Sequence, residues 1–388
     1  MEKLKKRYVL LIGLFISIII VLISIPRDIE IPIDEDHPSA SGNYAYMSDH
    51  IFSLNVIEVS ESIDPGVPVY EDTTGNARGV YVSGDYAYVA DSSSGLAVID
   101  ISDPTNPGTP VYEDTTGDSR GVYVSGQYIY VADSTSGLAV IDISDPINPG
   151  TPVYKDTTGD ARGVYIRGDY AYLADGASGL AIINISNPTN PGTPIYEDTT
   201  GSARSVYVSD NYAYVADSTS GLAIIDVLDP TNPGTPIYED TTGSANGVYV
   251  RGDYAYVADT SSGLAVIDIS IPTNPGTPIY KSTTGYAFDV YVSGNYAYLA
   301  DGDSDLAVID VSDPMNPGTP IYEVTTGYAI GIYVRGNYAY LADGASGLAI
   351  FHVSIPEAIP FGNFFLIYIG FSIICLIVYK KRKVILEY

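Results

Sequence analysis

The chain has 388 residues, and its 47 acidic residues outnumber its 18 lysines and arginines to give a net charge of −29. A surface of this charge repels nucleic acid and anionic lipid, so nucleic acid is not an expected partner. A single cysteine excludes an internal disulfide framework, and because no cofactor-binding motif is present, no cofactor is expected.

The first 25 residues consist of a basic tip and an apolar run. Four lysines and arginines precede about 18 apolar residues without a charge, a length that spans a bilayer as a helix. The run ends in Ile-Ser-Ile-Pro-Arg rather than in the small residues of a signal cleavage site. Residues 1–25 are therefore predicted to be a transmembrane anchor, with a cleaved signal as the alternative, and residues 26–36 form a linker.

A 42-residue repeat occupies residues 37–356. Its clearest marker is a tyrosine found in every copy at Tyr44, Tyr86, Tyr128, Tyr170, Tyr212, Tyr254, Tyr296 and Tyr338. A period kept without insertion indicates one supersecondary unit that is stacked many times.

Each copy contains four short runs rich in Val, Ile and Tyr, as strands prefer. In the copy that begins at Arg78 they lie at 79–83, 85–90, 95–102 and 109–115. Turn sequences such as Ser-Gly-Asp and Asp-Pro-Thr-Asn-Pro-Gly separate the runs, and no window shows a helical apolar stripe. Four short antiparallel strands in about 40 residues make one blade of a β-propeller, so the predicted fold is all-β.

Eight copies predict an eight-bladed propeller. The last copy lacks its fourth strand, and the period places the linker run DIEIPI at 28–33 where that strand should lie. Residues 26–36 are therefore expected to close the ring. The first copy is degenerate at 37–41, so a seven-bladed ring with the edge strands of one repeat spare is the alternative.

A second apolar run, within 357–379, predicts a C-terminal transmembrane helix, and 380–388 is a basic tail. Because both basic clusters lie at the outer tips, the positive-inside rule places both termini in the cytoplasm and the propeller outside the cell membrane. The chain would enter and leave the propeller on the same face of the ring. Arg167, Arg251 and Arg335, at the turn after the innermost strand, would then lie on the membrane side.

The run GLAVIDIS at 95–102, with GDYAYVAD before it and SDPTNPGTP after it, resembles the LVIVD repeat family of extracytoplasmic propeller-like proteins. All eight copies carry the run, and the first, SLNVIEV at 53–59, departs most. The resemblance implies a β-propeller at the cell surface. It implies no established activity and supplies no catalytic residues.

An aspartate ends the second strand of every copy: Asp49, Asp91, Asp133, Asp175, Asp217, Asp259, Asp301 and Asp343. A ring of carboxylates is a candidate cation site, and the alternative, which we favour, is that each Asp caps the turn that follows it. The stretch from Asp301 through Asp303 to Asp305 resembles the start of a calcium loop and is a candidate metal site, although it lacks the later glutamate of such a loop.

The loop that leads into the innermost strand differs systematically between copies. Its last residue is Arg78, Arg120, Arg162 and Arg204 in four successive copies, and then Asn246, Phe288 and Ile330. Two residues earlier, the last two copies carry Tyr286 and Tyr328. One arc of the channel mouth is therefore predicted to be cationic and the other aromatic, which suits an acidic sugar or a carboxylate-bearing chain end. The alternative is that each Arg pairs with a second-strand Asp and only holds the blades together.

These features predict a membrane-anchored binding, adhesion or interaction scaffold whose partner is a surface protein or an acidic glycan. A purely structural envelope protein is one alternative. A carboxylate-based glycan hydrolase or lyase is another, but an enzyme is not expected, because the chain has three histidines and none of the common catalytic motifs.

Overall fold

The computed structural model describes residues 39–41, 44–48, 54–58 and 68–353. The chain divides into two compact units, one of which lies within Ile63–Ser354 and holds most of the described residues.

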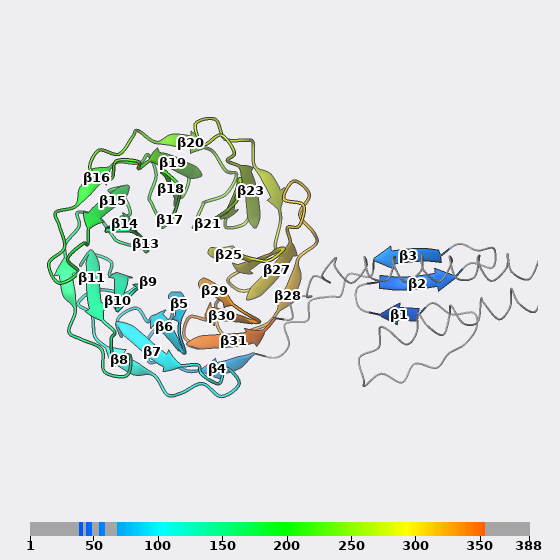
Figure 1. Cartoon of the computed structure of the whole chain (residues 1–388), viewed down its shortest axis with the longest axis horizontal. Helices are drawn as coiled ribbons and strands as arrows, with labels where there is room; N and C mark the ends of the chain where they lie inside the picture. Colours follow the sequence, from blue (N-terminus) through cyan, green and yellow to red (C-terminus); the bar gives the residue numbers. More distant parts are fainter. Residues whose placement is uncertain (1–38, 42–43, 49–53, 59–67, 354–388) are drawn as a thin grey trace, which may run out of the picture. The chain divides into compact units, whose positions relative to one another are not determined.

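Seven four-stranded antiparallel sheets surround a central axis in the larger unit, like the blades of a propeller (Figure 1). The innermost strands are β5 (Gly79–Ser83), β9 (Gly121–Ser125), β13 (Gly163–Arg167), β17 (Ser205–Ser209), β21 (Gly247–Arg251), β25 (Asp289–Ser293) and β29 (Gly331–Arg335). The second strands are β6 (Tyr86–Ala90), β10 (Tyr128–Ala132), β14 (Tyr170–Ala174), β18 (Tyr212–Ala216), β22 (Tyr254–Ala258), β26 (Tyr296–Ala300) and β30 (Tyr338–Ala342).

The outer half of each blade has a five-residue strand and a three-residue strand. The third strands are β7 (Leu96–Asp100), β11 (Leu138–Asp142), β15 (Leu180–Asn184), β19 (Leu222–Asp226), β23 (Leu264–Asp268), β27 (Leu306–Asp310) and β31 (Leu348–His352). The outermost strands are β8 (Val111–Glu113), β12 (Val153–Lys155), β16 (Ile195–Glu197), β20 (Ile237–Glu239), β24 (Ile279–Lys281), β28 (Ile321–Glu323) and β4 (Val69–Glu71). We number the blades 1 to 7, from the blade that begins with β5 to the blade that begins with β29.

A two-residue turn joins each innermost strand to the second strand and sets the register. In blade 1 the turn begins at Gly84, whose φ is +58°, and the flanking pair is Ser83 opposite Tyr86. Two-residue hairpin turns need a left-handed conformation, which glycine adopts without steric cost. In blade 4, Asp210 takes this place with a φ of +47°.

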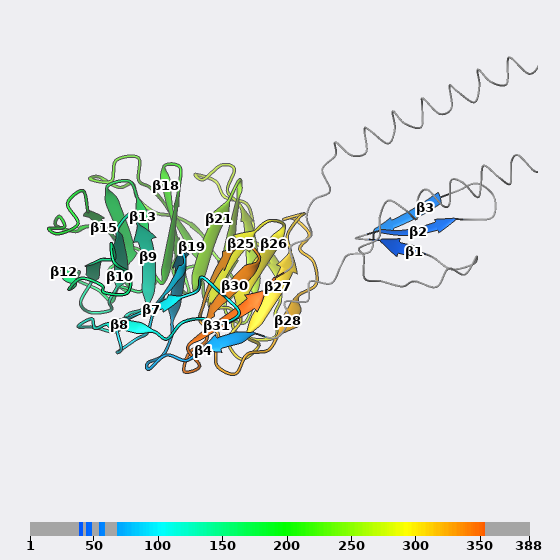
Figure 2. The same cartoon turned by 60° about the horizontal axis from the view of Figure 1, so that its bottom comes forward.

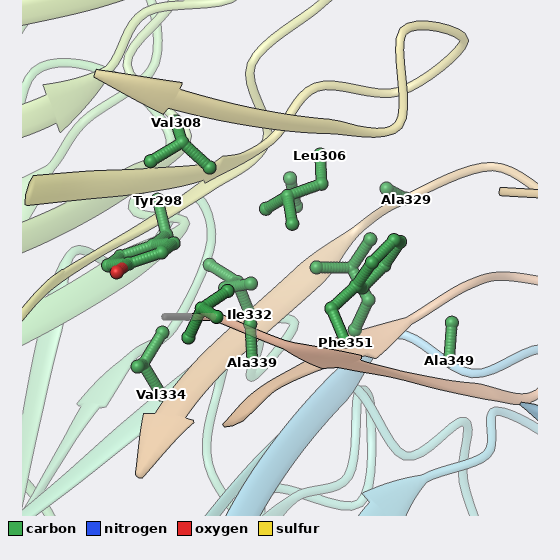
Figure 3. Close-up of a cluster of buried hydrophobic side chains, with 12 residues drawn as sticks. Tyr298, Leu306, Val308, Ala329, Ile332, Val334, Ala339, Ala349 and Phe351 are labelled. Carbon is green, nitrogen blue, oxygen red and sulfur yellow. The ribbon is translucent and has the colours of Figure 1, made fainter. Parts of the chain in front are cut away.

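The core lies between neighbouring blades. The second and third strands bury both faces, whereas the innermost strands bury alternate residues. Between blades 6 and 7, Tyr298 and Val308 pack with Ile332 and Phe351, as Figure 3 shows. Each blade needs a neighbour on both sides to cover its apolar faces, so the ring has to be closed.

Strand β4 closes the ring and corrects the predicted blade count. It pairs with β31 through Val69 opposite Ile350 and Tyr70 opposite Ala349, and Figure 2 shows the two strands side by side. The eight-bladed ring and the closing strand at 26–36 are therefore wrong, and the seven-bladed alternative is confirmed. The physical reason is that β4 repeats the Val-Tyr-Glu of β8, so it fits the third strand of the last blade in the same register.

The first repeat supplies only its fourth strand to the propeller. Its other strands, β1 (Ser39–Ser41), β2 (Tyr44–Ser48) and β3 (Leu54–Glu58), form a separate antiparallel sheet in the order β1-β2-β3. This sheet belongs to the second compact unit.

Among the residues that the structure describes, none belongs to a helix of the length and apolarity that a membrane crossing requires. The segments predicted to cross the membrane, 1–25 and 357–379, lie outside the described residues, as do the linker and the basic tail.

Candidate functional site

The loops that enter the innermost strands are held from two sides at the mouth of the central channel. In blade 1, the carboxylate of Asp91 accepts hydrogen bonds from Thr73 Oγ1 at 2.8 Å and from the Gly75 amide at 2.8 Å. The hydroxyl of Tyr112 accepts a third from the Thr74 amide at 3.0 Å. The Thr-Thr-Gly of each loop is thus bound by the second and the outermost strand of one blade, which fixes the residues that follow it.

The aspartates at the ends of the second strands therefore hold these loops in every blade, which the prediction of turn caps did not include, and Asp259 in addition bonds Ser262 of its own turn. The turn after Asp91 is closed by the backbone, where the Ser94 amide donates to the Asp91 carbonyl at 3.0 Å. Burial raises the pKa of Asp91, and the bonds from Thr73 and Gly75 lower it in part. The same threonine and glycine bonds recur at Asp133, Asp175, Asp217, Asp259, Asp301 and Asp343.

A role in cation binding has no geometric support in the described part of the chain, where no three acidic, histidine or cysteine side chains are arranged to hold a metal ion. Asp49 lies outside that part. In the predicted calcium loop, Asp301 holds Thr283, Asp305 is buried 2.7 Å from Thr325 Oγ1, and Asp303 is exposed. The three carboxylates are thus directed to different places.

Four arginines immediately precede the innermost strands of blades 1 to 4 and form one arc of the mouth. The backbone places them there, since the amide of Arg78 donates to the Ala90 carbonyl at 2.9 Å and the preceding Ala77 amide donates to Gly344 of blade 7 at 2.9 Å. The equivalent bonds of Arg120, Arg162 and Arg204 to the second strand are also 2.9 Å. We call Arg78, Arg120, Arg162 and Arg204 the arginine arc.

One carboxylate serves two members of the arginine arc. Asp160 Oδ2 accepts from Arg120 Nη1 at 3.0 Å and lies 3.0 Å from Arg162 Nη2. Burial tends to raise the pKa of Asp160, but Ser134 and the two arginines together hold it below its usual range. Within the described residues, Arg78 and Arg204 make no ion pair. The predicted pairing of each Arg with a second-strand Asp is therefore wrong.

The arginine arc carries unbalanced charge. Desolvation lowers the pKa of Arg204, and the charges of Arg162 and Arg120 lower it further. The buried Nε atoms of Arg78, Arg120 and Arg204 have no hydrogen-bond partner. Because a guanidinium stays protonated in proteins, the arc brings positive charge to the mouth of the channel.

The opposite side of the mouth is aromatic, as the sequence predicts. The rings of Phe288 and Tyr328 meet edge to face with centroids 5.4 Å apart, and Tyr286 is 52% exposed. Asn246, which follows the arc in blade 5, is buried and donates to the Ala287 carbonyl at 3.1 Å, while its Oδ1 has no partner.

Two features of the channel were missed by the sequence reasoning. The first is a closed collar of seven tyrosines with neighbouring centroids 4.7 to 5.0 Å apart: Tyr81, Tyr123, Tyr165, Tyr207, Tyr249, Tyr291 and Tyr333. Burial raises the pKa of Tyr123 and Tyr249 to about 12, so the hydroxyls stay protonated near neutral pH. Each collar tyrosine is the middle residue of its innermost strand, three positions after the place of the arc residue. The tyrosine at the centre of each innermost strand is the sequence signal for the collar.

The second missed feature is Asp289, the first residue of β25. The equivalent residue is glycine in five blades and Ser205 in blade 4, so Asp289 is the one charged group at this level of the channel. Its departure from the repeat is the signal that would have found it.

The sequence profile of the LVIVD repeat matches eight segments of the chain. They are residues 39–67, 74–110, 116–152, 158–194, 200–237, 242–279, 284–320 and 326–358. No curated protein matches the sequence significantly.

Solved structures resemble the chain in fold at low sequence identity. The WD40 repeats of RRP9 superpose with a TM-score of 0.63 at 8% identity, covering 76% of this chain and 100% of that one. The computationally designed Ika8 protein gives 0.55 at 10% identity over 82% and 98%. The Neurospora crassa Pan2 WD40 domain gives 0.55 at 14% identity over 74% and 90%. At such identities the likeness concerns the propeller fold alone.

Proposed function

The chain belongs to the LVIVD repeat family, and we propose that its propeller is a recognition module that binds an anionic group of a partner at the channel mouth. One observation carries the proposal: of the four guanidinium groups of the arginine arc, those of Arg120 and Arg162 pair with the carboxylate of Asp160, and within the described residues those of Arg78 and Arg204 make no ion pair. Carboxylate, sulfate and phosphate groups match the planar fork of donors that arginine offers, and a partly desolvated site strengthens such bonds.

The distribution of charge over the propeller supports the same function. All seven arginines of residues 68–353 lie at an end of an innermost strand, four in the arginine arc and three at Arg167, Arg251 and Arg335. Five of the outermost strands end in glutamate, for example at Glu113, and third strands end in exposed aspartates such as Asp100. An acidic rim around a cationic axis repels anions from the edge and attracts them to the centre.

The chain path favours a position on the cell surface. Strand β31 ends, and β4 begins, on the face that carries the turns after the innermost strands, opposite the face of the arginine arc. The segments 1–25 and 357–379, whose composition predicts membrane anchors, thus both connect along the chain to the face of the propeller opposite the arginine arc. A surface protein or an acidic glycan is then the partner that can reach it.

We propose binding rather than catalysis at this mouth. Glycan hydrolysis by carboxylates uses two acids on either side of the scissile bond. In the described channel mouth, Asp160 is paired with Arg120 and Arg162, and Asp289 stands alone at its level. The charge of Asp118 in the preceding loop also acts on Arg120, so the acids beside the arc lie near guanidinium groups, an arrangement that supports charge complementarity more than acid catalysis.

The test is the binding of the full-length chain, in detergent micelles, to immobilised polygalacturonate and to neutral dextran. We expect retention on polygalacturonate alone, and at least a roughly tenfold loss when the four residues of the arginine arc are changed to alanine. The matched control replaces Arg167, Arg251 and Arg335, at the other mouth of the channel, with alanine and should bind as the native chain does.

Equal loss in the two variants would attribute the binding to overall charge. Unchanged binding in the arc variant would overturn the proposed function. Where both variants melt at the native temperature, a loss confined to the arc variant supports it, and the same pair of proteins then serves to capture the natural partner from a surface extract of the native cells.

A further inference from the structure

Asp289 is the one charged residue among the seven that open the innermost strands. It opens β25 in blade 6 at the position of Gly79, Gly121, Gly163, Ser205, Gly247 and Gly331. The innermost strands approach closely here, since a Cβ on Gly121 would lie 2.8 Å from the Arg162 carbonyl. A side chain at this level is therefore an exception to the packing of the ring.

The carboxylate of Asp289 has two backbone partners. Oδ1 accepts from its neighbour Val290 at 2.9 Å, and Oδ2 accepts from the Ile332 amide of blade 7 at 3.1 Å. Each oxygen keeps a further lone pair, and the residue as a whole is half-buried. Within the described residues no cation pairs with it.

The bond to Ile332 does not explain why blade 6 needs an acid. Five blades have glycine and one has Ser205 at this level, and they keep the same strands and the same register. A buried carboxylate without a positive partner costs free energy, so its presence calls for a group that a ligand supplies.

The strand that Asp289 opens lies across the ring from strands that follow members of the arginine arc. In a ring of seven, blade 6 lies opposite blades 2 and 3, and Figure 1 shows β25 across the centre from β9 and β13 (Figure 1). The residue before it, Phe288, belongs to the aromatic pair with Tyr328. The mouth therefore has a positive side, a negative side and an aromatic wall beside the negative one.

We infer that the channel mouth binds a zwitterionic ligand, with its anionic group on the arginine arc and its ammonium group on Asp289. This inference rests on the proposed function and adds the class of ligand. The ammonium donates to the free lone pairs of Asp289, and it also gains from the face of Phe288 or Tyr328. A ligand with an anionic group alone leaves Asp289 without a partner.

The test uses two series of probes of equal length, measured by calorimetry on the full-length chain in detergent. One series is 4-aminobutyrate, 6-aminohexanoate and 8-aminooctanoate, and the other is butyrate, hexanoate and octanoate. We expect the best amino acid to bind roughly tenfold more tightly than its carboxylate. In Asp289→Asn the two should bind alike, with the affinity for the plain carboxylate unchanged or higher.

A second variant guards against misfolding. Asp289→Gly installs the residue that five other blades carry, so it should fold and should also lose the preference. A preference that is absent in the native chain, or that survives in both variants, overturns the inference. Arc-dependent binding of polygalacturonate tests the proposed function separately, so a ligand that is anionic but not zwitterionic would be recognised as such.

Discussion

The carboxylate of Asp91 accepts a 2.8 Å hydrogen bond from the hydroxyl of Thr73, eighteen residues earlier in the chain. Thr73 lies on the loop that arrives from blade 7 and Asp91 in blade 1, so the bond ties the arriving loop to the blade it enters. Its repetition in all seven blades explains why an aspartate ends every second strand and why Thr-Thr-Gly follows every outermost strand.

Loss of one such aspartate should destabilise the propeller. In Asp217→Ala, Thr199 Oγ1 and the Gly201 amide lose the acceptor that they bond at 2.7 and 2.8 Å. Donors left unpaired in a buried place cost about 2–3 kcal/mol in the free energy of unfolding. Urea denaturation measures the change, and Asp240→Ala, at an exposed site in the same blade, should stay close to native. Equal effects would contradict the assigned role.

Asp305→Gly should stabilise the protein. Asp305 has a φ of +62° at a position where the other six blades have glycine. Its carboxylate lies 2.7 Å from Thr325 Oγ1, which is also 2.7 Å from Asp343, although the hydroxyl has one proton to donate. Glycine removes the strain of the positive φ and the competition of two carboxylates for one hydroxyl proton. Together these changes should raise the free energy of unfolding by about 1–2 kcal/mol at pH 7.

The mirror change in blade 5 is the control for this prediction. Gly263 has a φ of +78°, and a Cβ there would lie 2.5 Å from the Lys281 carbonyl. Gly263→Asp should therefore destabilise by at least as much as Asp305→Gly stabilises. If calorimetry shows Asp305→Gly to melt below the native chain, the aspartate contributes a favourable contact that outweighs its conformation.

The sequence predicted the blade well because each strand and turn is a local pattern that is repeated many times. The number of blades depends on which segment pairs with the third strand of the last blade, where Val69 lies opposite Ile350. Two segments could form that outermost strand: the run at 28–33 and the Val-Tyr-Glu of the first repeat. Periodicity alone could not choose between them. In the structure the Val-Tyr-Glu of the first repeat forms this strand, because its residues match those of the other outermost strands and pair in the same register.

At the site, the sequence located the arginine arc and the aromatic side but not their partners. The position of Arg120 follows from the backbone, whereas its bond to Asp160 depends on which way two long side chains turn. The partner of Asp91 was predicted wrongly because its own turn already closes through backbone bonds, which leaves the carboxylate for the neighbouring loop. Such choices depend on tertiary contacts that a pattern of residues does not encode.

Asp160→Asn should separate the stability of the mouth from its affinity for anions. Without this carboxylate, Arg120 and Arg162 lose their shared partner, which should cost about 1 kcal/mol at low salt and less at 0.5 M salt. The same change removes a negative charge from the arc, so polygalacturonate should bind a few times more tightly. Urea titrations at both salt concentrations and the retention assay measure the two effects. Weaker binding would mean that Asp160 orients the arginines for the ligand.

Asp289 should make the stability of the propeller depend on pH. Burial raises its pKa to about 7, and the bonds from Ile332 and Val290 offset only part of this. Gly247 on β21 and the Ile332 amide on β29 lie against it, and within the described residues no charged group shifts its pKa. A carboxyl whose pKa is higher in the folded than in the unfolded state stabilises the fold in its protonated form. Its contribution is complete below the unfolded pKa near 4 and is lost as the pH rises through about 7.

Asp289→Asn should therefore melt at nearly the native temperature at pH 4 and several degrees above it at pH 8, because the variant has no charge to bury. Differential scanning calorimetry across this range measures the gap between the two proteins, in which the titration of all other acids cancels. A gap that stays constant from pH 4 to pH 8 would mean that Asp289 remains in one protonation state. A zwitterionic ligand should narrow the gap at pH 8 in the native chain alone, since its ammonium supplies the charge that the folded protein lacks.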